Sequence, residues 1–259
     1  MNKNAYSTID LSARRNAQMG IKMKIIFSLT FKSASRDPFL ILWSIVLPIG
    51  GAIGLGIFIK SPDYPQHILT GMMAISILFY SFMTTSFAIL IQRRRGVYNL
   101  LRVTPMPLWK YICSISGAWT LISFLCAMLV LLSGVFVLKI NISLMSFLAL
   151  IPIIIIATAG YIFFSFFIAS LSRTDNNVSI LTNIITMPLM FCSSAFYSLN
   201  NTPEFIKTVS CFNPFQWFVS GLRNALELSW LSYLIHLGLV LLVAIVALIL
   251  ALKTFRYSE

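Results

Sequence analysis

Acidic side chains are scarce in this sequence. Only 7 of its 259 residues are Asp or Glu, against 19 Lys and Arg, and there are 2 histidines. A gradient-driven transporter normally places an acid or a paired base inside the membrane, but the long apolar runs here contain no Asp or Glu. An intramembrane enzyme is disfavoured as well, because there is no carboxylate pair, no His-Glu-x-x-His motif and no plausible Ser/His or Cys/His constellation. No catalytic residue is predicted.

Other absences narrow the chemistry further. No glycine is followed directly by lysine, so a Walker-A phosphate loop is excluded. The four cysteines have no metal-binding spacing: Cys113, Cys126, Cys192 and Cys211. Cys192 and Cys211 both fall near the predicted outer membrane surface, but all four are expected to be thiols. A net charge of +12 usually suggests a nucleic acid or an acidic surface. Here the charges fill the gaps between apolar runs, so neither a metal nor a nucleic acid is expected.

Apolar residues dominate the remainder. The chain is 58% hydrophobic and only 10% charged, which is typical of a polytopic membrane protein. Six runs are long enough to cross a bilayer, at about 39–59, 67–91, 111–138, 144–171, 178–198 and 231–252. We expect an all-α membrane protein whose residues 38–259 form a six-span transmembrane domain. Gly50 and Gly54 in the first run would let another helix approach closely, and packing within the chain is favoured over a dimer seam.

Residues 1–37 form a polar, basic leader. The stretch 19–31 predicts an interfacial helix, with Met23, Ile26 and Phe27 on one side. If the leader is inside the cell, 15 of the 19 Lys and Arg lie on the inner side. The positive-inside rule then places both termini in the cytoplasm.

Residues 92–111 (QRRRGVYNLLRVTPMPLWKY) join the second and third runs. They hold five basic residues and no acid. A solvated positive-inside loop would explain the charges. Val97, Leu100 and Leu101 exceed what a connector needs, so we interpret the segment as a docking element for a cytoplasmic partner.

The stretch 199–230 is too apolar for a free loop and too short for a domain. Two helix starts are predicted here, at Thr202-Pro203-Glu204 and at Asn213-Pro214. In each, a residue that can cap the helix comes directly before a proline at the first helical position. We predict two re-entrant helices that enter the outer leaflet and return, forming a lid over an outward exit. Arg223 and Glu227, spaced i,i+4, could pair.

Three segments carry a family resemblance: RRGVYNLLRVTP at 94–105, MPLMFCSSAFY at 187–197 and NPFQWFVSGLR at 213–223. SRDP at 35–38 fits the same pattern. In their order and spacing these segments resemble the permease subunit of ATP-binding-cassette exporters of the compact six-span, type-2 family. Gln92 and Asn99 depart from it, because they stand where acids of a coupling salt bridge are usual.

The resemblance implies a bacterial cytoplasmic-membrane exporter whose ATP and Mg are bound by a separate nucleotide-binding subunit, with no cofactor on this chain. A second permease protomer, identical or paralogous, and membrane lipids would be the other partners. The segment 92–109 becomes a coupling helix, with contact residues Arg93, Arg94, Arg95, Gly96, Val97, Tyr98, Leu100, Leu101, Arg102, Thr104 and Pro105. The outer gate becomes Asn213, Pro214, Arg223 and Glu227.

Polar residues in the second and fifth runs suggest a substrate pathway, since the resemblance places these runs at the protomer seam. The candidates are Tyr80, Thr84, Asn183, Thr186, Met187, Met190 and Phe191. Hydrogen bonding between neighbouring helices would equally explain the polar members. The neighbouring Phe and Met side chains are apolar and flexible, which suits a hydrophobic or amphipathic drug, antibiotic or peptide. A polysaccharide, teichoic-acid or lipid-linked substrate, and a non-transporting membrane scaffold, remain the alternatives.

Overall fold

The computed structural model describes residues 20–36, 38–59, 64–97, 107–199 and 202–255. Within these ranges every regular element is helical, which confirms the predicted all-α class. The elements are residues 20–34, α2 (Pro38–Phe58), α3 (Tyr64–Leu78), the π-helical turn η1 (Phe79–Thr84), α4 (Thr85–Arg94), α6 (Leu108–Leu138), α7 (Leu144–Leu171), α8 (Asp175–Phe191), α9 (Glu204–Cys211), α10 (Pro214–Glu227) and α11 (Trp230–Phe255).

Four stretches of the described chain are long and apolar enough to cross a membrane. They are Tyr64–Arg94, Trp109–Leu138, Leu144–Leu171 and Trp230–Thr254. They contain the second, third, fourth and sixth predicted runs. The first and fifth runs correspond to α2 and α8, but α8 ends at Phe191, seven residues before the predicted end at position 198.

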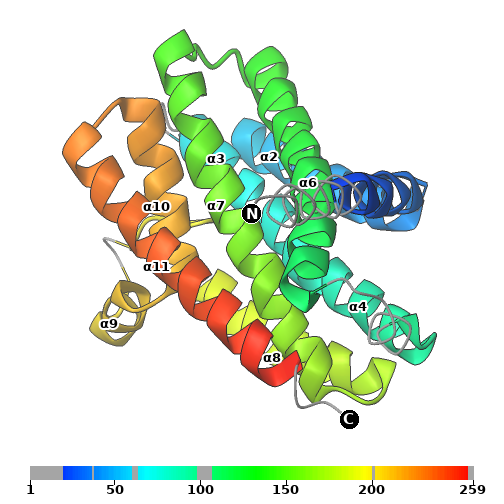
Figure 1. The fold of residues 1–259 in the computed structure, drawn as a ribbon. Helices are drawn as coiled ribbons and strands as arrows, with labels where there is room; N and C mark the ends of the chain where they lie inside the picture. The colour runs from blue at the N-terminus through cyan, green and yellow to red at the C-terminus, as the bar shows by residue number, and fades with distance from the viewer. Residues whose placement is uncertain (1–19, 37, 60–63, 98–106, 200–201, 256–259) are drawn as a thin grey trace, which may run out of the picture.

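Helix α7 lies between α6 and α11 and contacts both (Figure 1). Helices α7 and α11 approach closely at Gly160, where an added Cβ would lie 3.1 Å from the Cα of Ala244. Small residues at such crossings let helix backbones meet in a bilayer, where packing rather than the hydrophobic effect drives association. The helix α10 fills the space beside α7, α11 and α3, with Phe215 and Phe218 fully buried.

Short polar side chains connect the helices of the second run to their neighbours. Ser76 donates to the Ser44 carbonyl of α2 at 2.5 Å, and the Ser81 hydroxyl lies 3.0 Å from that of Ser123 in α6. The Thr85 and Ser165 hydroxyls are 2.6 Å apart. Each of these bonds joins two helices, as hydrogen bonds between short polar side chains commonly do in a bilayer.

The helix at 20–34 lies beside α6 and runs crosswise to it (Figure 1). Its predicted face packs inward: Met23 and Ile26 border a core cluster, and the Ser114 hydroxyl of α6 donates to the Met23 carbonyl at 2.7 Å. Ile21, Ile25 and Leu29, which interrupt the predicted stripe, are all exposed on the other side. The helix therefore has a packed apolar face and a second, outward apolar ridge.

The glycines of α2 divide between two faces. Gly51 packs on Met72 of α3, and Gly56 packs on Leu138 of α6. Gly50 and Gly54 are exposed, and a Cβ at either would meet no described atom within 4 Å. The prediction that Gly50 and Gly54 pack within the chain is therefore wrong, because the helix turns this pair away from α3 and α6.

Candidate functional site

One end of the helix bundle, which we call the basic end, holds the last turn of α4. Here Arg93 reaches the C-terminus of α7 and donates to the carbonyls of Ala169, Ser170 and Ser172 at 3.0–3.2 Å. The last carbonyls of a helix have no partner inside it and attract cationic donors. Arg93 thus caps α7 from a neighbouring helix.

Arg94 continues the connection into the next helix. Its guanidinium forms an ion pair with Asp175, in the first turn of α8, with 2.7 Å between Nη1 and Oδ2, and it donates to the Arg173 carbonyl at 3.2 Å. Both side chains are exposed, so the pair adds at most about 1 kcal/mol to stability. The ion pair fixes the position of α4 relative to the turn between α7 and α8.

The predicted coupling segment starts directly after this contact. Gly96 has φ of 71°, a left-handed conformation that favours glycine, and it turns the chain away from α4. Arg95 is exposed, and Val97 packs partly against the core cluster of α4, α6 and α7. The other proposed contact residues lie outside the described part of the chain: Tyr98, Leu100, Leu101, Arg102, Thr104 and Pro105.

Beside the end of α8, Asn213 organises the start of α10. Its side-chain oxygen accepts from the backbone N–H groups of Phe215 and Gln216, with Pro214 at the first helical position, as predicted for this start. Its amide nitrogen donates to the carbonyls of Leu189 and Cys192 at 2.8 and 3.0 Å. One side chain therefore caps the beginning of α10 and the end of α8.

The start of α9, the first of the two helices predicted in the stretch 199–230, differs from the prediction. Helix α9 begins at Glu204 with Pro203 at the N-cap, and Thr202 donates instead to the Leu199 carbonyl at 2.8 Å. The threonine hydroxyl was expected to cap the helix, but it satisfies the preceding turn.

Arg223 of α10 makes no close ion pair with Glu227, although the two opposite charges attract each other. It donates from Nε to the Thr70 hydroxyl at 3.2 Å, from Nη1 to the Ser194 hydroxyl at 2.5 Å and from Nη2 to the Ser194 carbonyl at 2.5 Å. Its Nη2 also lies 3.1 Å from His67 Nε2, which can accept only in the tautomer that carries its proton on Nδ1. The guanidinium thus joins α10, α3 and the stretch 192–199 that follows α8.

That stretch is wedged tightly against α3. A Cβ at Gly71 would lie 1.9 Å from the Ala195 carbonyl oxygen, so only glycine fits there. Gln216 adds a further contact, because its side-chain oxygen accepts from the Ser194 N–H at 2.6 Å. These are polar, convergent contacts around backbone that would otherwise lack partners at membrane depth.

The sequence singled out Asn213, Pro214 and Arg223 but missed their partners. His67 was interpreted as an interface residue, and neither Gly71 nor Gln216 was selected. The available signal was the lone arginine in an apolar region, since such a cation must find acceptors.

The predicted pathway residues do not share one surface. Tyr80 is buried in the core, and the Thr186 hydroxyl is buried without a hydrogen bond to any described residue. Asn183 is half-buried and bonds Ser179 within α8 at 3.3 Å. Met187, like Phe191, is exposed, whereas Thr84 and Met190 are half-buried. Helix α8 therefore has a threonine face turned inward and an apolar ridge turned outward.

The described residues contain no group of three or more His, Cys, Asp or Glu side chains that could hold a metal ion. The four cysteines are free thiols. The arrangement is a set of apolar helices clamped at both ends by arginine, in a multi-pass membrane protein.

Comparison with known proteins identifies the class. Residues 22–226 match the family model described as "ABC-2 type transporter". The chain is also similar to a protein of Cyanophora paradoxa named "Putative transport permease ycf38", with 25% identity over 239 residues that cover 82% of this chain and 81% of the relative. The chain belongs to the ABC-2 type transporter family, which confirms the resemblance deduced from the sequence.

Proposed function

We propose that this chain is the membrane-embedded permease subunit of an ATP-driven exporter, and that a separate nucleotide-binding subunit binds ATP and Mg. The observation that carries the proposal is the family match over residues 22–226. The sequence supports it, because a phosphate-binding loop needs a Gly-Lys pair and this chain has none. The proposed topology has six spans, with α2 and α8 as the first and fifth, in a bacterial cytoplasmic membrane with both termini in the cytoplasm.

The basic end supplies a route for coupling. The segment 92–109 is proposed to seat in a groove of the ATPase subunit through Leu100 and Leu101, as a helix in a groove. Arg93 and Arg94 tie the base of this segment to α7 and α8. A displacement of the segment would therefore move two helices together, as a rigid-body transition requires. The helix at 20–34 is proposed as a second contact, lying at the membrane surface.

Replacing Leu100 and Leu101 by Asp tests the docking role. We expect loss of co-purification with the ATPase subunit and loss of stimulated ATP hydrolysis, with membrane insertion intact, because charge replaces the apolar contact. Leu144→Asp is a matched control, since Leu144 is exposed at the start of α7, at the opposite end. Unchanged co-purification of the Leu100/Leu101 variant would refute the docking role, and ATP-independent activity of the purified chain would refute the exporter.

A second protomer is proposed to cover the Gly50 and Gly54 face of α2, where an added Cβ would meet no described atom within 4 Å. Gly50→Leu with Gly54→Leu should reduce the cross-linked dimer to monomer, because bulk at a small-residue contact separates the backbones. Gly238→Leu is the control, as Gly238 in α11 is equally open. A dimer that persists in the α2 variant would place the seam elsewhere.

The transported substrate is proposed to be hydrophobic or amphipathic, a drug, antibiotic or peptide. The exposed Met187 and Phe191 of α8 favour this class, since soft apolar side chains accommodate varied ligands. ATP-dependent uptake into vesicles that contain this chain and the ATPase subunit distinguishes this class from a polysaccharide or lipid-linked cargo. Absence of any ATP-dependent transport would favour a scaffold.

A further inference from the structure

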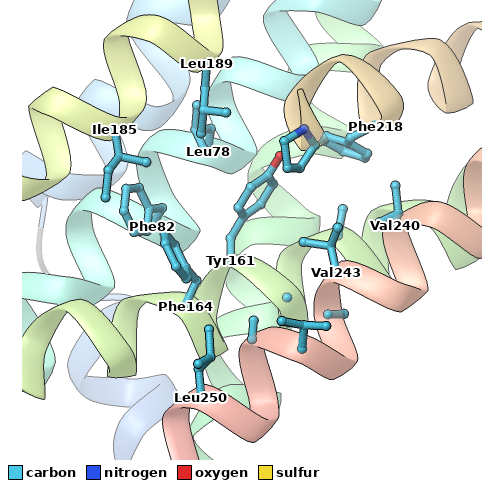
Figure 2. Close-up of a pocket in the computed structure, with 16 residues that line it drawn as sticks. Leu78, Phe82, Tyr161, Phe164, Ile185, Leu189, Phe218, Val240, Val243 and Leu250 are labelled. Atoms are coloured by element: carbon cyan, nitrogen blue, oxygen red, sulfur yellow. The ribbon is translucent and has the colours of Figure 1, made fainter. Parts of the chain in front are cut away.

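A cavity of about 220 Å³ lies inside the helix bundle, between η1, α7, α8, α10 and α11. Its walls are almost entirely hydrocarbon. Figure 2 shows Ile185 and Leu189 of α8 on one side and Val240 and Val243 of α11 on the other, with aromatic rings between them. Apolar cavities of about 150 Å³ stay dry and take up a benzene-sized molecule, so this cavity has room for a substituted ring.

One polar atom faces this hydrocarbon space. The Tyr161 hydroxyl points toward the Phe218 end of the cavity (Figure 2), and it makes no hydrogen bond to any described residue. A hydroxyl in apolar surroundings without a partner is costly. An ordered water needs two to four polar partners, and the lining offers only this one. A ligand oxygen would satisfy the hydroxyl where water cannot.

The cavity opens toward the lipid. Val246 belongs to its lining and is 50% exposed on α11. Across the described residues α8 and α11 share no extended contact, which leaves a gap between the Ile185 and Val246 walls. The lining residue Phe82 comes from η1, a π-helical turn of the kind that often marks functional positions.

The depth of Tyr161 restricts the occupant. It stands 17 residues into α7 and 10 before its end, so it lies about 15 Å from the basic end at the usual rise per residue. The hydrocarbon core of a bilayer is about 30 Å thick, so this distance places Tyr161 near the middle of the membrane. The ester groups of a phospholipid lie at the bilayer surface and would not reach Tyr161. A whole small molecule dissolved in the bilayer would.

We propose that this cavity binds a compact, largely apolar molecule with one hydrogen-bonding oxygen, taken from the bilayer through the gap between α8 and α11. The Tyr161 hydroxyl pairs with that oxygen, and the walls of α7, α8 and α11 bury the rest. The site lies within one protomer, on the Ile185 and Leu189 side of α8, and does not include the pathway candidates Asn183 and Met187. It requires neither the ATPase subunit nor a dimer.

The test uses the purified full-length chain in lipid nanodiscs and a photoactivatable alkylphenol, with the matched alkylbenzene that lacks the hydroxyl. Peptides of α7 and α11 should be labelled saturably by the phenol. Tyr161→Phe should lower phenol labelling roughly threefold to tenfold, the value of one hydrogen bond, and leave alkylbenzene labelling unchanged. Val243→Phe should abolish labelling by both probes, because the ring fills the cavity.

Ile245→Phe is the matched control, as Ile245 is 50% exposed on the same helix and does not line the cavity. Equal labelling of the Val243 and Ile245 variants would overturn the proposal, as would phenol labelling that is the same with and without the Tyr161 hydroxyl. Labelling confined to lipid-facing residues would mean an adventitious probe only. Because no ATPase is present, failure here leaves the exporter proposal standing, and failure of the exporter proposal leaves this site standing.

Discussion

Arg223 connects α10, α3 and the stretch 192–199 through its guanidinium. Arg223→Lys keeps the charge but loses the planar fork that reaches Thr70 and both oxygens of Ser194. We expect the loss of about 1–3 kcal/mol of stability, the usual cost of leaving buried partners unsatisfied. Thermal unfolding in detergent measures it.

The same variant should loosen the stretch 192–199. With Cys192 as the only cysteine, its reaction with a maleimide should become faster, because this half-buried thiol adjoins the Ser194 contact. Arg173→Lys is the control, since it makes the same chemical change at an exposed arginine near the basic end. If both variants match the parent in stability and reactivity, Arg223 does not clamp this stretch.

The contrast between Asn213 and Arg223 shows how far sequence reasoning extends at single residues. The Asn213 cap was predicted correctly, because the side chain and the N–H groups it accepts from are two and three positions apart. The predicted Arg223–Glu227 pair is present only as an attraction without direct contact, because the groups that hold Arg223 lie on other elements and spacing along one helix describes only that helix. Partners 153 and 156 positions away leave no trace in the local sequence.

At the scale of elements, α4 is expected to hold the end of α7 in place through Arg93. Arg93→Gln removes a charged donor to three carbonyls. We expect the loss of about 1–3 kcal/mol and faster amide exchange over residues 169–178, where α7 ends and α8 starts. Hydrogen exchange with mass spectrometry measures this locally.

Arg95→Gln makes the same chemical change two positions away, at an exposed side chain. It should leave exchange over 169–178 unchanged. Equal exchange in the two variants would show that α7 ends without help from α4.

Helix positions were largely predictable, and one helix end was not. Length and hydropathy located the apolar runs, because burial in lipid demands about 20 apolar residues wherever the chain crosses. The end of α8 at Phe191 follows from Asn213, which captures the Leu189 and Cys192 carbonyls from a position more than 20 residues later. Apolar residues such as Ala195 and Phe196 continue past Phe191, so hydropathy predicted a longer helix. The π-turn η1 likewise had no signal in the run that contains it.

At the scale of the whole molecule, large apolar side chains are exposed on most of the described helices. Ile184 and Met187 on α8, and Leu242 and Ile245 on α11, are about half exposed or more. In a bilayer such surfaces meet lipid or another helix without the cost they would have in water. The outward glycines of α2 differ from these lipid-like faces, because they offer close approach rather than bulk.

The orientation of the entire bundle follows from charge and can be tested at two positions. Arg95 and Asn141 are exposed at opposite ends, beyond α4 and before α7. The inner side is predicted to hold 15 of the 19 Lys and Arg. In a variant without native cysteines, Arg95→Cys should therefore react with a membrane-impermeant maleimide only after permeabilisation, and Asn141→Cys should react in intact cells. The reverse pattern would place the proposed coupling segment outside the cell, where no ATP is available to a docked ATPase. Because Arg93 and Arg94 bind α7 and α8 to that segment, the same result would also remove the proposed route from nucleotide to helices.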